Sequence, residues 1–107
     1  MDFKEYQKKS RQTAKYDKAG DNYIYPTLGL VSEAGEVAGK VKRTMRDGYT
    51  KKSLRSDIKK ELGDVLWYVA QVATEFDLSL EEVAQLNLEK LFSRQERGKL
   101  SGEGDDR

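Results

Sequence analysis

The chain has 107 residues, of which 36% are hydrophobic and 36% are charged, and its formal net charge at pH 7 is +1. It contains no cysteine and no histidine, which excludes disulfides, thiolate zinc sites and every catalytic arrangement that needs histidine. A near-neutral charge disfavours nonspecific binding to nucleic acid, no apolar run approaches the roughly 18 residues that span a bilayer, and the N-terminus lacks a signal-peptide core. We expect one cytoplasmic domain over residues 1–107, with neither nucleic acid nor membrane as a partner.

Helical periodicity begins at the N-terminus. Residues 2–18 are predicted to form the first helix, with Asp2 as its N-terminal cap. After a polar loop, Pro26 suits the first turn of a second helix. Apolar residues then recur at helical spacing as far as Gly48, which is the expected C-terminal stop.

The second half of the chain predicts two further helices. The third is expected to begin near Ser56 or Asp57, after a short basic connection, and the fourth begins with a capping box of Ser79 and Glu82. The tail over residues 98–107 contains glycines and polar residues, and we expect it to be flexible. No alternating apolar run predicts a strand. Four helices joined by short loops predict an all-α, antiparallel four-helix bundle.

The apolar content is low for a free-standing monomer of this length. A domain of about 100 residues buries a smaller share of its surface than a larger domain does. Burial between subunits would compensate for this, so we expect a homodimer or a homotetramer.

Two segments of the chain share one pattern. Residues 32–41 read SEAGEVAGKV and residues 60–69 read KELGDVLWYV, so an acid, any residue, glycine, an acid and valine recur at an offset of 28 residues. The four acids are Glu33, Glu36, Glu61 and Asp64. On a helix, the two acids of each segment lie about 60° apart. If the two helices pack antiparallel, four carboxylates converge on one groove.

Two interpretations of this groove are open. Clustered carboxylates repel one another and stay ionised only with a compensating cation, and oxygen ligands alone select a hard ion such as Mg²⁺, with Mn²⁺ also suitable. In the other interpretation the acids form a solvated surface, with Glu36 paired to Lys40. Gly35 and Gly63 are each unfavourable in a helix, and we expect them to allow a close approach of the two helix backbones.

The run SEAGEV followed by KKELGDVLWYV resembles the MazG-type, all-α nucleoside triphosphate pyrophosphohydrolases. Their signature is E-x-x-E on one helix and E-x-x-D on the next, which this chain reproduces with 24 residues between Glu36 and Glu61. The resemblance covers most of the chain, from YPTLGLVSEAGEV to the closing RQERGKLSGEGDDR. One departure is Ser32, where many members carry a further glutamate. The difference would alter water activation or rate without removing the ligand set.

The resemblance implies a reaction and its residues. A nucleoside triphosphate would be hydrolysed to the monophosphate and pyrophosphate with Mg²⁺, in a housecleaning role for the nucleotide pool. The four acids would be the metal ligands, and Glu33 and Glu36 are the candidates for receiving the proton of the attacking water. The lack of histidine fits this chemistry, because positioning and charge neutralisation carry most of phosphoryl transfer.

Six further residues are candidates for substrate binding. They are Lys40, Lys60, Tyr68, Asn87, Lys90 and Arg94. Tyr68 lies one helical turn after Asp64, and in similar enzymes a tyrosine at this position lies near the nucleotide. A position at a subunit interface or at the edge of the core is the alternative. Asn87 and Lys90 also resemble substrate contacts of the family. For the lysines near the acids, an ordinary surface position is the alternative.

Two other functions are compatible with the sequence. Phosphoribosyl-ATP pyrophosphohydrolase belongs to the same superfamily and is the alternative enzyme. A noncatalytic helical interaction module, whose acids form only a solvated face or a structural cation site, is the alternative from another class. Pyrophosphate release from a panel of nucleotides, with Mg²⁺ or with a chelator, distinguishes an enzyme from such a module.

Overall fold

The structure is a computed structural model that describes residues 1–98 and 102–107. It contains four α-helices, which are α1 (Phe3–Arg11), α2 (Ile24–Asp47), α3 (Lys51–Glu75) and α4 (Leu80–Glu96). No strand occurs in the described residues. The predicted all-α class with four helices is therefore confirmed. None of these described helices has the length and apolar character needed to cross a membrane.

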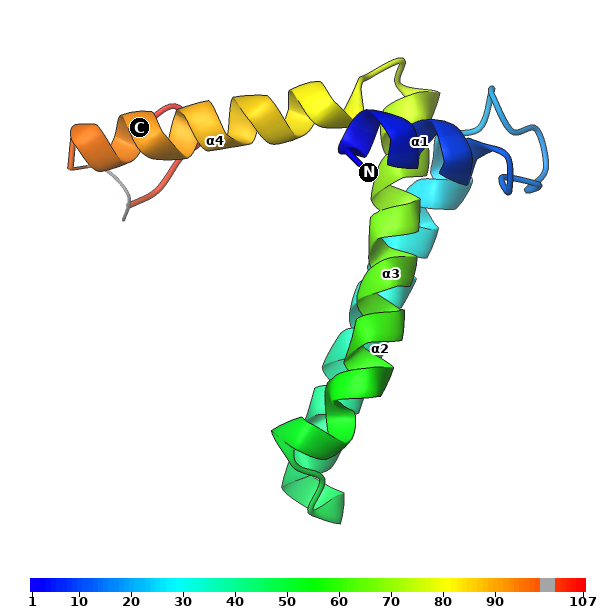
Figure 1. The fold of residues 1–107 in the computed structure, drawn as a ribbon, viewed down its shortest axis with the longest axis vertical. Coiled ribbons are helices and arrows are strands. Elements are labelled where there is room, and N and C mark those ends of the chain that lie inside the picture. Colours follow the sequence, from blue (N-terminus) through cyan, green and yellow to red (C-terminus); the bar gives the residue numbers. More distant parts are fainter. Residues whose placement is uncertain (99–101) are drawn as a thin grey trace.

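The helices α2 and α3 form a long antiparallel hairpin that is the main body of the molecule (Figure 1). α2 ends at Gly48, which adopts a left-handed conformation with φ of 73° as predicted. The predicted start of α3 near Ser56 is wrong, because Thr50 and Ser53 cap each other's backbone N–H groups at 3.2 and 2.9 Å. This reciprocal capping begins α3 at Lys51 and shortens the connection between the two helices.

The first helix is shorter than predicted. The Asp2 cap is confirmed, since its carboxylate accepts a hydrogen bond from the backbone N–H of Glu5 at 2.8 Å. The helix ends at Arg11 instead of continuing to residue 18. The Thr13 hydroxyl donates to the Ser10 carbonyl at 2.7 Å, and Lys18 has a positive φ of 56°. Residues 12–23 therefore form a loop between α1 and α2.

Polar side chains hold α1 against the end of α3 and the start of α4. Gln71 on α3 is fully buried and donates to the Ser10 hydroxyl at 2.9 Å. Gln7 donates to the Thr74 hydroxyl at 3.0 Å and accepts from the backbone N–H of Leu80 at 2.9 Å. These contacts lie between segments that are more than 60 residues apart in the sequence.

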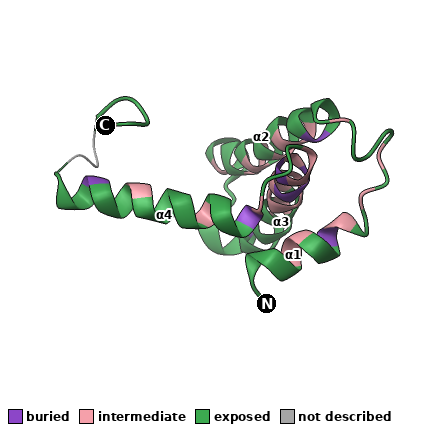
Figure 2. Ribbon diagram, turned by 90° about the horizontal axis from the view of Figure 1, so that it is seen from above, coloured by how far each residue is buried: buried purple, intermediate pink, exposed green. Residues whose placement is uncertain are grey.

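The helix α4 leads away from the hairpin and makes no contact with α2 within the described residues (Figures 1 and 2). The predicted antiparallel bundle is therefore not closed within one chain. The radius of gyration is 16.6 Å, against about 13 Å for a compact domain of this length. The apolar side chains that α4 leaves at least one-third exposed are Val83, Leu86, Leu88, Leu91 and Phe92.

The expectation of a flexible tail over residues 98–107 falls in part on residues 99–101, which lie outside the described residues. Gly98 and the turn over residues 102–107 are described. In that turn the Asp105 carboxylate lies 3.1 Å from the Lys90 ammonium and 3.6 Å from the Arg94 guanidinium. The end of the chain is thus in contact with the last turns of α4.

Candidate metal centre

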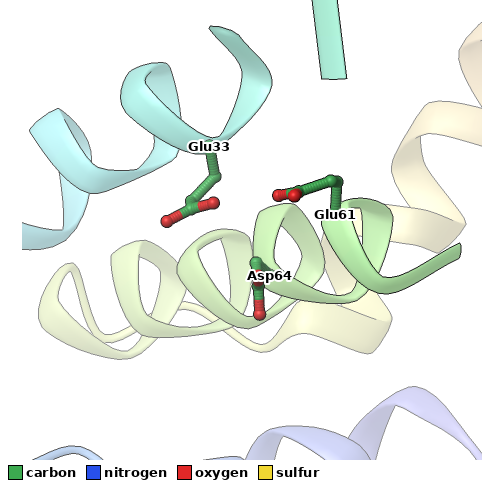
Figure 3. Close-up of side chains that lie close together, drawn as sticks. All are labelled: Glu33, Glu61 and Asp64. Atoms are coloured by element: carbon green, nitrogen blue, oxygen red, sulfur yellow. The ribbon is translucent and has the colours of Figure 1, made fainter. Parts of the chain in front are cut away.

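Three carboxylates lie close together between α2 and α3. Glu33 extends from α2 toward α3, which carries Glu61 and Asp64 (Figure 3). One carboxylate oxygen of each residue lies within 4.8 Å of those of the other two. We call these three residues the acidic triad. The antiparallel hairpin forms it because acids of both repeated motifs face the same side of the helix pair.

Electrostatic repulsion is concentrated on Glu33. Partial burial raises the pKa of Glu33, and the negative charges of Asp64, Glu61 and Glu36 raise it further. Ionising all of these groups together is therefore unfavourable without a nearby positive charge. A divalent cation among the triad would supply that charge and stabilise the ionised form.

Glu36 lies outside the triad. Its side chain is exposed, and its negative charge raises the pKa of Glu33, which lies one turn earlier on α2. The structure therefore brings together three of the four acids, with Glu36 beside them. The expectation that Gly35 and Gly63 allow close helix approach is wrong within one chain, because a Cβ atom at either position would have no neighbour within 4 Å.

The close approach between α2 and α3 occurs at Gly29, a position that the sequence patterns did not indicate. A Cβ atom at Gly29 would lie 2.1 Å from Cε1 of Tyr68. The Tyr68 ring thus packs directly on the backbone of α2, one turn before Glu33 on α2 and one turn after Asp64 on α3. Any side chain at position 29 would displace this ring.

Tyr68 is coupled to the triad and to other aromatic residues. Burial and a hydrogen bond with Tyr25 raise the pKa of Tyr68 to about 12. The charges of Glu33 and Asp64 act in the same direction, so the Tyr68 hydroxyl lies near the triad. Its ring also packs edge-on against Trp67, with the ring centroids 5.0 Å apart.

Tyr6 and Tyr25 were missed in the sequence analysis. Burial and then the charge of Asp64 raise the pKa of Tyr6, which places this α1 residue near the triad. The Tyr25 ring lies 6.4 Å from that of Tyr68. The repeated acid motif could not reveal either residue, because Tyr6 approaches from α1 and Tyr25 lies two turns before Glu33 on α2, outside the motif.

Two lysines of the hairpin, Lys40 and Lys60, were predicted to bind substrate, and their surroundings differ. The Lys40 ammonium lies 3.7 Å from the Asp57 carboxylate across the hairpin. The expected alternative pairing of Lys40 with Glu36 is therefore not seen. Lys60 is exposed and directly precedes Glu61 on α3.

The predicted residues of α4 are separated from the triad within one chain, because α4 leads away from the hairpin (Figure 1). Asn87 is exposed, whereas Arg94 is buried to 4% exposure beneath the tail. The Nε atom of Arg94 is buried and has no hydrogen-bond partner among residues 1–98 and 102–107. The Lys90 ammonium lowers the pKa of Asp105 through a hydrogen bond and its charge, and the Arg94 guanidinium lowers it further.

The donor set of the triad fits a hard divalent ion. Three carboxylates offer only oxygen ligands, and the chain has neither histidine nor cysteine to make the site suitable for softer metals. Two of the triad residues are half-buried and Asp64 is exposed, which leaves one side of the site open to a ligand. A divalent ion held by these carboxylates would be able to polarise a phosphoryl oxygen and to lower the pKa of a bound water.

Comparison with known proteins identifies the family. Residues 26–98 match the MazG nucleotide pyrophosphohydrolase domain, and the chain belongs to this family. The matched segment contains the whole triad. The chain is also 49% identical over 109 residues to the Gene 37 protein of Mycobacterium phage L5, which covers 95% of this chain and 96% of that protein. No solved structure matched the chain.

Proposed function

We propose that this protein is a Mg²⁺-dependent nucleoside triphosphate pyrophosphohydrolase with a housecleaning role in the nucleotide pool. It would hydrolyse ribo- or deoxyribonucleoside triphosphates to the monophosphate and pyrophosphate. The observation that carries the proposal is the acidic triad, which lies inside the segment that matches the MazG domain. We further propose that residues 1–107 act as one domain.

The metal would be Mg²⁺, with Mn²⁺ as a substitute, and Glu33, Glu61 and Asp64 would hold it. When bound, such an ion neutralises phosphate oxygens and makes a water molecule more acidic. The residues of the chain would position the triphosphate for attack by a water molecule. The attack forms one phosphorus–oxygen bond and breaks the anhydride bond between the α- and β-phosphates, so that pyrophosphate leaves.

Glu36 is our candidate for accepting the proton of the attacking water. It is the one acid of the repeated motifs that lies outside the triad, and its charge acts on Glu33. A carboxylate that does not hold the ion keeps its lone pairs for a proton. Glu33 would then serve in ion binding.

The nucleotide would contact residues from two parts of the molecule. Tyr68 borders the triad in one chain, and Lys60 is next to Glu61. The cations of α4 lie away from this site, so Lys90 and Arg94, together with Asn87, would reach a triphosphate only through a second chain.

An oligomer would account for the large exposed surface. The chain exposes 8257 Å², whereas a compact monomer of 12.2 kDa exposes about 6,100 Å². The excess of about 2,000 Å² is of the size that stable subunit interfaces bury. We therefore propose a homodimer or homotetramer in which α4, with Leu86 and Phe92 more than half exposed, packs on a second chain.

The test is pyrophosphate release from a panel of canonical and modified nucleoside triphosphates, with Mg²⁺ or with a chelator. We expect turnover that depends on the ion and falls by at least about 100-fold in Asp64→Asn and Glu61→Gln. Glu82→Gln, an exposed acid of α4, is the matched control and should retain full activity.

Absence of turnover on every nucleotide would refute the proposed enzyme and favour a noncatalytic helical module. Selective turnover of phosphoribosyl-ATP would instead indicate the other hydrolase of the superfamily. Retention of activity in both triad variants would show that the triad is not the metal centre.

A further inference from the structure

Glu75, the last residue of α3, is the centre of a hydrogen-bond network outside the triad. Its side chain is fully buried, and its carboxylate accepts from the Arg11 guanidinium at 3.0 Å and the Tyr16 hydroxyl at 2.7 Å. The backbone N–H groups of Gly20 and Asn22 also donate to it, each at 2.8 Å. One carboxylate thus binds the end of α1 and three positions of the loop over residues 12–23.

The network requires an ionised acid. All of its partners are donors, and a carboxylate is the side chain that only accepts hydrogen bonds. Burial would raise the pKa of Glu75, but the hydrogen bonds from Asn22, Tyr16, Gly20 and Arg11 outweigh this effect and lower it to about 2. A glutamine at this position would direct its own N–H donors at one or more of these donors.

The loop that Glu75 holds places Tyr16 against an aromatic residue of α2. The Tyr16 ring stacks on Tyr25 with the centroids 5.1 Å apart, and Tyr25 lies against Tyr68. Asn22 also accepts from the backbone N–H of Tyr25 at 3.1 Å, which orders the first turn of α2. From Glu75 a continuous series of contacts therefore leads through Tyr16 and Tyr25 to Tyr68, and the charges of Glu33 and Asp64 act on the Tyr68 hydroxyl.

We propose that Glu75 is a positioning residue for nucleotide binding: it fixes the loop over residues 12–23 so that Tyr16 and Tyr25 support Tyr68 beside the triad. This inference rests on the proposed function, because it assumes a nucleotide at the triad. Glu75 does not touch the substrate in this proposal. It acts through the loop, and the ion-binding carboxylates are independent of it.

The chain contains a single tryptophan, Trp67, which reports on this region. Its ring lies edge-on to Tyr16 at 6.5 Å, and its Nε1–H donates to the Thr13 hydroxyl at 2.8 Å. Release of the loop would remove both contacts. Acrylamide quenching of Trp67 emission therefore measures loop order without any ligand.

The experiment compares wild type with Glu75→Gln in three measurements: Trp67 quenching, Mn²⁺ affinity, and the affinity for non-hydrolysable α,β-methylene analogues of ATP, GTP, CTP and UTP. We expect stronger quenching, analogue affinity lowered by about tenfold, and Mn²⁺ affinity within about twofold of wild type. Asp77→Asn, an exposed acid two residues further on, is the control and should change none of these.

A second variant covers the case in which Glu75→Gln does not fold. Tyr16→Phe removes one hydroxyl from the network and should lower analogue affinity about threefold with Mn²⁺ affinity unchanged. Unchanged analogue affinity in the folded variants, or a parallel loss of Mn²⁺ affinity, overturns the inference. Failure of the wild type to bind any analogue contradicts the proposed function instead, while the quenching result still shows whether Glu75 orders the loop.

Discussion

The two ends of the α2–α3 hairpin differ in how far their polar and apolar groups are covered by the rest of the chain. The end where α2 begins and α3 finishes is covered by α1 and the loop over residues 12–23, and we call it the closed end. Glu75 and Gln71 fix α1 and this loop there. At the tip, residues 40–60, the chain places nine lysines and arginines with only two acids. The tip also has an open groove of about 1070 Å³ whose apolar lining includes Leu54 and Ile58.

The two ends therefore differ in whether their polar groups find partners within the chain. The closed end satisfies its polar groups within the molecule, and it is there that the aromatic residues border the triad. In the described residues, the tip leaves both charged and apolar groups exposed to solvent. Substitutions at the closed end should therefore change stability in the isolated chain more than substitutions at the tip.

The largest effect is expected at the buried carboxylate. Glu75 has a pKa of about 2 in the folded chain against an ordinary value of 4.5, a difference worth about 3 kcal/mol of stability. Because the folded pKa is lowered, this contribution is complete above pH 4.5 and is lost as the pH falls toward 2. Urea unfolding from pH 7 to pH 2 should show this loss for wild type, and Glu75→Gln should lack it.

Asp77→Asn provides the control for this titration, since Asp77 is exposed beyond the end of α3. Its unfolding free energy should follow the wild-type pH dependence. Equal unfolding free energies of Glu75→Gln and wild type at pH 7 would show that the ionised Glu75 carboxylate does not stabilise the folded chain.

Ion binding should produce the next largest effect. An ion that binds only the folded chain stabilises it by about 2.7 kcal/mol at a free concentration 100 times its Kd. We expect Mn²⁺ to raise the melting temperature of wild type and not that of Asp64→Asn. Asp57→Asn, an acid of the tip, should respond to Mn²⁺ as wild type does. A rise of the same size in all three proteins would place the ion elsewhere.

A pair of glycine substitutions tests the packing between the helices. Gly29→Ala would place Cβ 2.1 Å from the Tyr68 ring and should lower the unfolding free energy by about 1–3 kcal/mol. Gly35→Ala would place Cβ in open space and should raise it by up to about 1 kcal/mol. Urea unfolding measures both, and a stabilised Gly29→Ala would show that Tyr68 does not lie on this backbone.

The smallest effect is expected at the tip. The Lys40 ammonium and the Asp57 carboxylate are 3.7 Å apart, and the Asp57 side chain is half exposed. Lys40→Ala should therefore lower the free energy of unfolding by less than about 1 kcal/mol. The cost should fall further in 1 M NaCl, because salt screens exposed charges. A cost that is large and independent of salt would mean that the tip is as strongly organised as the closed end.

Local signals were sufficient to predict much of the fold. The number of helices, the caps at Asp2 and Ser79 and the stop at Gly48 follow from residues adjacent in the sequence. The repeated acid motif also indicated which faces of α2 and α3 would meet. The start of α3 was missed because Ser53 supplies the reciprocal cap in place of the more usual glutamate or glutamine.

Features that depend on distant contacts could not be predicted in this way. The loop over residues 12–23 is fixed by Glu75, which lies 55 residues from Gly20, so helical periodicity alone extended α1 too far. The direction of α4 was also missed. Its apolar residues follow the helical pattern of a bundle, but in the described residues α4 does not contact α2, and five of its apolar side chains stay at least one-third exposed.

The contact between Gly29 and Tyr68 has a consequence for selectivity among ions. Here the Tyr68 ring lies directly against the backbone of α2, one turn from Glu33 on α2 and one turn from Asp64 on α3. If the triad holds an ion as proposed, the size of ion that fits best would depend on this uncharged contact. Discrimination between Mg²⁺ and the larger Ca²⁺ would consequently be altered by changing the bulk at position 68, with every acid left in place.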